Sequence, residues 1–181
     1  MLGLSFEVQA ADVPETLEPA ESAVAHVERL ARDKALSVSS LRPGAAVLGG
    51  DTVVSLDQEI LGKPSGPEQA EEMLLRLSGR THLVASGLAL VGPSGELRST
   101  VSTTEVTFRR FSREVAQAYV GTGEPLDKAG SYGIQGLGAA LVTEIRGDYY
   151  CVVGLPVAAL LKLFDESGWE YSFPSGRKRD P

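Results

Sequence analysis

The sequence of 181 residues has few of the side chains on which many metal and redox sites depend, with one cysteine, two histidines and one tryptophan. A single cysteine, Cys151, excludes an internal disulfide and fits a reducing compartment. His26 and His82 have no Cys or His partner at zinc-ligand spacing, which excludes a tetrahedral zinc site. No stretch reaches the roughly 20 apolar residues of a membrane-spanning helix, and no secretory signal is present. We therefore expect a cytoplasmic protein without membrane contact.

Several catalytic motifs are absent as well. There is no G-x-S-x-G nucleophile elbow, and the Gly62-Lys63-Pro64 segment has proline where a P-loop needs Ser or Thr. The string GIQGLG lacks the glycine spacing of a dinucleotide-binding fingerprint. The net charge of −7 argues against general nucleic-acid binding. A few cations converging in one cleft could still bind the phosphates of a nucleotide.

The composition is that of one globular domain, because 43% of the residues are hydrophobic, 23% are charged and no linker divides the chain. We expect a single domain over residues 1–170 and a flexible tail over 171–181. Hydrophobic periodicity and turn residues predict a mixed α/β order with an antiparallel hairpin in the middle. Strands are expected at 2–8, 45–50, 51–56, 81–91, 97–111 and 139–145, and helices at 21–38, 65–79, 112–119 and 156–166.

One of these helices has strong boundary signals. Ser65 and Glu68 have the spacing of a capping box, Pro67 lies near the first turn, and Gly79 follows the end. The glycine pair 49–50, in contrast, is expected to interrupt the strands on either side of it.

Carboxylates and lysines beside glycines are the remaining candidates for chemistry. Asp51 follows two glycines at a strand end, where it could bind a divalent metal or orient a water, although a turn aspartate is the simpler interpretation. Lys63 and Lys128 lie in short loops held by Gly and Pro, so either could bind a phosphate or merely be solvated.

Four other residues are ambiguous when each is taken alone. Gln135 lies between glycines, so its amide could read the edge of a base or point to solvent. Thr52 could be an ordinary strand residue. Lys34 sits among apolar helix positions and could extend from the edge of the core. Glu15 has the sequence context of a solvated loop charge.

Taken together, the motifs resemble those of the Maf family. They are GGDTVV, ILGKP, MLLRLSGRTH, VTF, GEPLDKAGSYGIQGLG and GDYYCVVGLP, and they follow one another in the family's order. The resemblance runs from about residue 4 to residue 168, and the DKAGSYGIQGLG string is the most specific part.

The resemblance implies an α/β fold similar to inosine triphosphate pyrophosphatases, with a mixed twisted sheet, flanking helices and two lobes around a cleft. It implies metal-assisted attack of water on a nucleoside triphosphate, with Mg or Mn as the cofactor, and a homodimer. By position, Asp51 corresponds to the general base and a metal ligand, and Glu15 to a second metal ligand. Lys34, Lys63 and Lys128 correspond to phosphate-binding residues, and Thr52 and Gln135 to residues that choose the base.

The strings DTVV, RLSGRTH and DKAGSYGIQG resemble the branch that hydrolyses dTTP and UTP to the monophosphate and pyrophosphate. Two alternatives stay open. One is a pyrophosphatase for another modified nucleotide, and the other is a nucleotide-binding or regulatory protein, linked to septum formation, with little turnover.

The sequence departs from the family at its start, because the Ser-x-Ser-Pro-Arg-Arg loop and the first strand and helix of the family are not present. Those arginines would be bidentate phosphate ligands, a geometry that lysine does not reproduce. Either Met1 is an internal methionine of a longer protein, or the chain is truncated and less active. The first is favoured because the other site residues are all retained.

Overall fold

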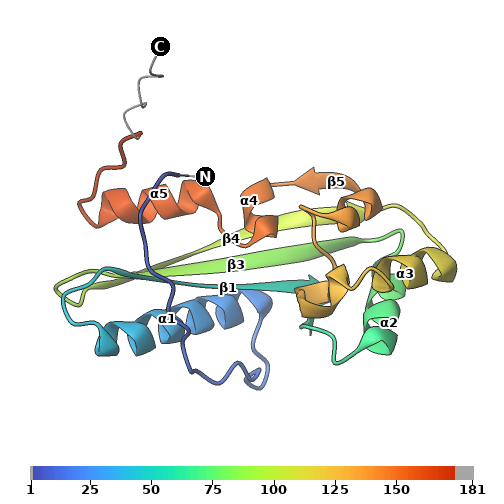
Figure 1. Cartoon of the computed structure of the whole chain (residues 1–181), viewed down its shortest axis with the longest axis horizontal. Helices are drawn as coiled ribbons and strands as arrows, with labels where there is room; N and C mark the ends of the chain where they lie inside the picture. Colours follow the sequence, from blue (N-terminus) through green and yellow to red (C-terminus); the bar gives the residue numbers. More distant parts are fainter. Residues whose placement is uncertain (1, 174–181) are drawn as a thin grey trace, which may run out of the picture.

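The computed structural model describes residues 2–173, and its frame is one five-stranded sheet in the order β2-β1-β3-β4-β5 (Figure 1). Every neighbouring pair of strands is antiparallel, so the described residues contain no parallel strands of the kind that a mixed sheet includes. The strands are β1 Val47–Leu56, β2 Glu59–Leu61, β3 Thr81–Val91, β4 Leu97–Phe108 and β5 Val142–Arg146.

Helices flank this sheet, which confirms the expected α/β class. The helix α1 (Ala23–Leu41) covers one face, while α4 (Tyr149–Val153) and α5 (Val157–Glu166) lie over the other (Figure 1). The helices α2 (Pro67–Leu77) and α3 (Arg113–Val120) pack against each other at one end of the molecule. The glycine-rich segment between α3 and β5 forms three short 3-10 turns, Glu124–Asp127, Ala129–Ser131 and Leu137–Leu141.

Small residues let α1 lie very close to the sheet. Ala31 and Ala35 of the helix are fully buried against Ala89 of β3. Gly49 of β1 and Gly87 of β3 lie directly under the helix backbone, where a Cβ on Gly49 would stand 2.4 Å from the carbonyl oxygen of Ala31. Because side chains alternate along a strand, the residues at 49, 51 and 53 of β1 all face α1. This close packing fixes the position of α1 relative to Asp51.

The two glycines of β1 do not interrupt it. Gly49 pairs with Ala89 and Gly50 with Leu88 in the continuous antiparallel ladder between β1 and β3. The expectation of two separate strands is therefore wrong, and the reason is that Gly49 serves the close approach of α1 and not a turn.

The strand expected at residues 2–8 is also absent, since this segment has no regular secondary structure. An apolar alternation makes a strand only when a neighbouring strand supplies hydrogen-bond partners, and no strand of the described residues pairs with this segment. Phe6 and Val8 are accordingly 80% and 87% exposed.

The capping box predicted for α2 is wrong, because the N-cap is Gly66 and has no side-chain cap. Ser65 lies one residue too early, and its backbone N–H donates to Gln69 Oε1 at 2.6 Å. Of the expected tail, residues 174–181 lie outside the described residues, and Tyr171 donates its hydroxyl to the carbonyl of Leu2 at 2.9 Å. None of the helices within 2–173 is long and apolar enough to cross a membrane.

Candidate active site

A free edge of β1 carries the candidate site. The short strand β2 pairs with β1 only at residues 54–56, and no other strand of the described chain covers the rest of that edge. Asp51 faces α1, whereas the next residue, Thr52, faces α4 on the opposite side of the sheet. A cavity of about 640 Å³ wraps around this edge and is lined by both side chains. A ligand in it could therefore contact residues from both faces of the sheet.

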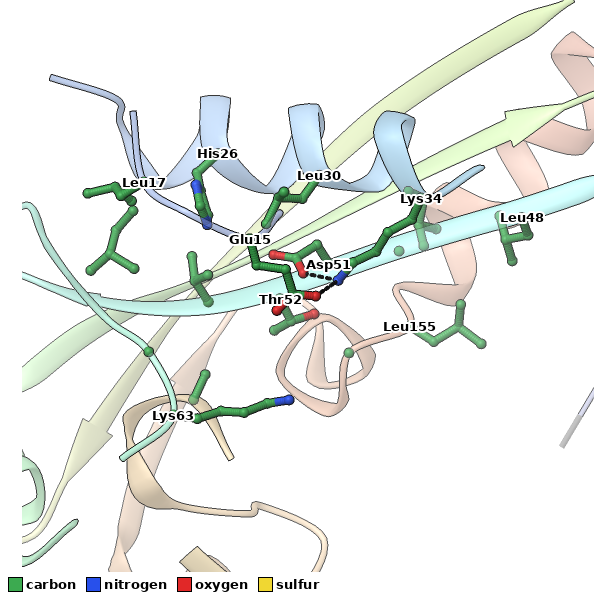
Figure 2. A pocket seen from close by; sticks show the side chains of 17 residues that line it. Glu15, Leu17, His26, Leu30, Lys34, Leu48, Asp51, Thr52, Lys63 and Leu155 are labelled. Atoms are coloured by element: carbon green, nitrogen blue, oxygen red, sulfur yellow. Dashed lines mark hydrogen bonds and ion pairs between the residues drawn. The ribbon is translucent and has the colours of Figure 1, made fainter. Parts of the chain in front are cut away.

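Lys34 of α1 joins two carboxylates in this cavity. Its ammonium group donates to Asp51 Oδ1 at 2.7 Å and lies 2.6 Å from Glu15 Oε1 (Figure 2). Lys34 reaches this point because His26, Leu30 and Lys34 form one stripe of α1, spaced four residues apart, that lines the cavity. The side chain of Asp51 is only 11% exposed, and that of Glu15 is half-exposed.

The charges of this cluster support one another. Burial opposes the positive charge of Lys34, but the hydrogen bonds to Asp51 and Glu15 outweigh it and raise the pKa of the Lys34 ammonium. The same hydrogen bond is the main reason that the pKa of Glu15 is lowered. Lys34 therefore stays protonated at neutral pH and holds Asp51 in a defined orientation.

Lys63 brings a second cation into the cavity. It follows β2 in the loop Gly62-Lys63-Pro64, and its side chain extends into the cavity from the wall opposite α1 (Figure 2). Lys63 forms no ion pair with any other residue of the described range. Its ammonium is therefore available to an anionic ligand.

A second cavity of about 490 Å³ adjoins the first, and the two share Thr52, Ala129 and Gly154. Its walls are mainly apolar and aromatic: Val54, Val84, Tyr132, Ile134, Val152 and Val153. Thr52, Gln135, Lys128 and Glu124 are its polar members. A few polar groups among apolar walls are typical of a pocket for a flat organic ring.

The structure thus divides the predicted site residues between two joined cavities. Glu15, Lys34, Asp51 and Lys63 line the first, and Thr52 lines both. Lys128 and Gln135 line the second. Lys128 donates to Asp127 at 2.7 Å, and its loop adjoins that of Lys63, since the backbone N–H of Gly130 donates to the carbonyl of Gly62 at 3.1 Å. Its phosphate contact stays a prediction.

Sequence reasoning missed Glu124, which organises the loop that holds Gln135. Its carboxylate accepts from the Tyr119 hydroxyl at 2.8 Å, from Leu137 N at 2.8 Å and from Gly138 N at 3.0 Å. Although burial opposes its charge, these donors lower the pKa of Glu124. A carboxylate within a glycine-rich string, where backbone N–H groups lack helix or sheet partners, was the available signal.

A second missed cluster lies at the start of α1. Glu21 accepts from Arg29 Nε at 2.7 Å and contacts His26 Nδ1 at 2.8 Å. The Arg29 guanidinium is the main cause that lowers the pKa of Glu21 to about 2. His26 Nδ1 also lies 3.3 Å from Arg29 Nη2, so this ring nitrogen contacts both partners of the Glu21–Arg29 ion pair. In the sequence, the four-residue spacing of His26, Leu30 and Lys34 indicates that His26 shares a helix face with Lys34.

Beneath the second cavity, His82 is buried among aromatic rings and makes stability depend on pH. Its Nε2 lies 2.8 Å from the Tyr132 hydroxyl, and burial lowers the pKa of His82 from 6.5 to about 4. The unfolded chain therefore binds this proton at a higher pH than the folded chain does. The contribution of neutral His82 to stability is fully present above pH 6.5 and is lost as the pH falls towards 4.

We predict that the free energy of unfolding falls less in a His82→Gln variant than in the original chain as the pH drops through this window. At neutral pH the variant should be the less stable of the two. Urea unfolding, followed by circular dichroism from about pH 7 to about pH 4, measures both slopes. Equal slopes for the two proteins would show that His82 does not titrate in this way.

The antiparallel α/β fold, with a charged cavity joined to an apolar one, defines a protein whose cleft suits a nucleotide-like ligand. The chain belongs to the Maf family, because the model of the Maf-like protein family matches residues 1–167. The resemblance drawn from the sequence motifs is thereby confirmed.

Curated relatives cover most of the chain. It is 50% identical over 168 residues to a dTTP/UTP pyrophosphatase of Symbiobacterium thermophilum, covering 93% of this chain and 86% of the relative. A dTTP/UTP pyrophosphatase of Myxococcus xanthus is 49% identical over 92% of this chain and 84% of its own length. One of Vibrio cholerae is 49% identical over 86% of this chain and 83% of its own length.

Proposed function

We propose that this chain hydrolyses dTTP and UTP to the nucleoside monophosphate and pyrophosphate. The observation that carries the proposal is the Lys34–Asp51 pair on the free edge of β1, in a charged cavity that opens into an apolar one. The relatives named dTTP/UTP pyrophosphatase support the choice of substrate.

Asp51 acts as the general base in this proposal. Its carboxylate takes a proton from the attacking water while the water oxygen forms a bond to the α-phosphorus. The bond to the bridging oxygen breaks, and pyrophosphate leaves with that electron pair. Lys34 orients Asp51 through the 2.7 Å hydrogen bond, so the free carboxylate oxygen is directed at the water.

Lys34 and Lys63 stabilise the charge of the triphosphate. They enter the same cavity from opposite walls. The Lys63 ammonium can donate up to three hydrogen bonds to phosphate oxygens, and Lys34 keeps one donor beyond those that contact Asp51 and Glu15. The charge that develops on the leaving pyrophosphate is then met by groups already in place. Gln135 and Thr52 contact the base in the adjoining cavity, and Lys128, on the wall of that cavity, contacts a phosphate.

Glu15 and Asp51 fit a divalent cation, Mg or Mn. Both carboxylates converge on the Lys34 ammonium, at 2.6 and 2.7 Å, so both face one point where positive charge is favoured. Residues 2–173 hold no cluster of three or more Asp, Glu, His or Cys side chains that could bind a metal. Two carboxylates completed by substrate phosphates are the ligand set that Mg²⁺ commonly takes. When bound, the cation would neutralise phosphate charge and polarise the anhydride.

A panel of nucleoside triphosphates tests this function. Pyrophosphate release is measured for dTTP, UTP, CTP, dATP and GTP with magnesium or manganese, and with the metal removed by a chelator. We expect turnover of dTTP and UTP that requires metal. Turnover of another nucleotide alone would favour a different pyrophosphatase, and binding of UTP without release would favour a regulatory protein.

A cytoplasmic homodimer is part of the proposal. Buried, unpaired Cys151 is compatible with a reducing compartment, and the half-exposed rings of Tyr149 and Tyr150 offer apolar surface for a partner. Light scattering on the sample used for the nucleotide panel tests the oligomeric state, and the mass of a single chain would contradict the dimer.

A further inference from the structure

A buried serine that the catalytic proposal does not use lies beside Thr52. Ser86 is on β3, directly opposite Thr52 in the ladder with β1, and its side chain is completely buried. Its hydroxyl donates to the carbonyl oxygen of Cys151 in α4 at 2.7 Å. Its oxygen is also 2.7 Å from the hydroxyl oxygen of Thr52.

Counting protons fixes the direction of this pair. A serine hydroxyl has one proton, and a carbonyl oxygen can only accept, so the proton of Ser86 lies on the bond to Cys151. The short contact between the two hydroxyls then requires Thr52 to donate to Ser86. The only proton of the Thr52 hydroxyl is thereby used. What Thr52 offers to a ligand is a lone pair.

Thr52 presents this hydrogen-bond acceptor where the two cavities meet. It lines the charged cavity of Asp51 and the apolar cavity of Gln135, so it lies where a nucleotide passes from its phosphates to its base. Gln135 cannot by itself decide which pyrimidine binds. Its amide has a donor end and an acceptor end, and rotation by half a turn exchanges them. A group of fixed polarity is needed to distinguish an acceptor from a donor on the ring.

We propose that Ser86 is a positioning residue that holds the Thr52 hydroxyl as a hydrogen-bond acceptor, and that Thr52 thereby selects a pyrimidine with a ring N–H. The inference rests on the proposed function and names its specificity device. Uracil and thymine carry a proton on N3, which donates to Thr52. The N3 of cytosine has a lone pair, which meets that of Thr52 with neither proton available. Such an unpaired contact in a desolvated site is costly.

The Ser86→Ala variant tests the relay with little disturbance of the fold. Alanine removes one atom, and the Cys151 carbonyl keeps a second donor, the backbone N–H of Gly154 at 3.1 Å. Without the Ser86 oxygen, the Thr52 hydroxyl is free to turn and donate. Ser55→Ala is the matched control, since Ser55 is a buried serine on the neighbouring strand and lines neither cavity.

We expect the preference of kcat/KM for UTP over CTP to fall by about tenfold or more in Ser86→Ala, mainly because CTP improves. The preference should stay within about twofold in Ser55→Ala. Thr52→Val, which keeps the shape of the side chain without the hydroxyl, should lose activity on UTP without a gain on CTP. Calorimetric binding of α,β-imido-UTP and α,β-imido-CTP should show the same changes in affinity.

Four outcomes would overturn the inference. If the original chain hydrolyses UTP and Ser86→Ala keeps the same preference, Ser86 does not set the polarity, and the proposed function stands. If the original chain does not prefer UTP over CTP, Thr52 does not select the ring N–H. If it neither hydrolyses nor binds the pyrimidine nucleotides, the proposed function fails, and this specificity device fails with it. Should Ser86→Ala not fold, an unchanged preference in Thr52→Val would decide against the proposal.

Discussion

An Asp51→Asn variant is expected to release pyrophosphate from UTP with a kcat lower by about 10²–10⁴-fold, the usual contribution of a positioned general base. Asparagine keeps the size of the side chain and an oxygen that can accept from Lys34, but it cannot take a proton from water. The KM for UTP should stay the same or fall, because a negative charge near the phosphates is removed while Lys34 and Lys63 remain. Initial rates over a range of UTP concentrations separate the two constants.

Asp57→Asn is the matched control for this change. Asp57 lies in the turn between β1 and β2 and pairs with Arg80 on the surface at 2.7 Å, so the same loss of charge occurs outside both cavities. Its kcat should stay within about twofold of the original value. An Asp51→Asn variant that kept its kcat to a similar degree would show that another group activates the water.

Some parts of the fold can be predicted from the sequence and others cannot. The hairpin of β3 and β4 was predicted because both strands have strand-forming residues and flank a short turn, which are local properties. The strand expected at 2–8 failed because strand formation depends on a partner far away in the chain. The pair Gly49-Gly50 predicts a break in the strand, because nothing local in the sequence shows that α1 packs on Gly49. Local signals predict the mixed α/β order, and the resemblance to the Maf family adds the particular fold.

The candidate site shows the same division. Taken alone, Lys34 is interpreted most simply as a helix lysine at the edge of the core, and Asp51 as a turn aspartate. They are 17 residues apart, and only the packing of α1 on β1 brings them to 2.7 Å. The sequence does not identify Ser86 as a functional residue, because no motif marks a serine within a buried strand. The direction of its hydrogen bond depends on the carbonyl of Cys151, 65 residues away.

Gly49→Ala is the substitution that should disturb both fold and site. An added Cβ would stand 2.4 Å from Ala31 O and 2.7 Å from Ala35 N, and helix backbone cannot yield as a flexible side chain does. We expect a loss of about 3 kcal/mol in the free energy of unfolding, the upper end of the range for overpacked cores, measured by urea unfolding. Because α1 must lift from the sheet, kcat should fall as well.

Gly50→Ala separates this effect from the general consequence of replacing glycine in β1. The side chain at 50 faces away from α1, and its nearest contact would be Leu88 Cδ2 at 3.4 Å, within reach of a small side-chain adjustment. Its loss of stability should therefore be clearly smaller than that of Gly49→Ala. If Gly49→Ala were as stable as Gly50→Ala, α1 would tolerate displacement from the sheet. In that case the ion pairs in the cavity, and not the packing of α1 on the sheet, would hold Lys34 against Asp51.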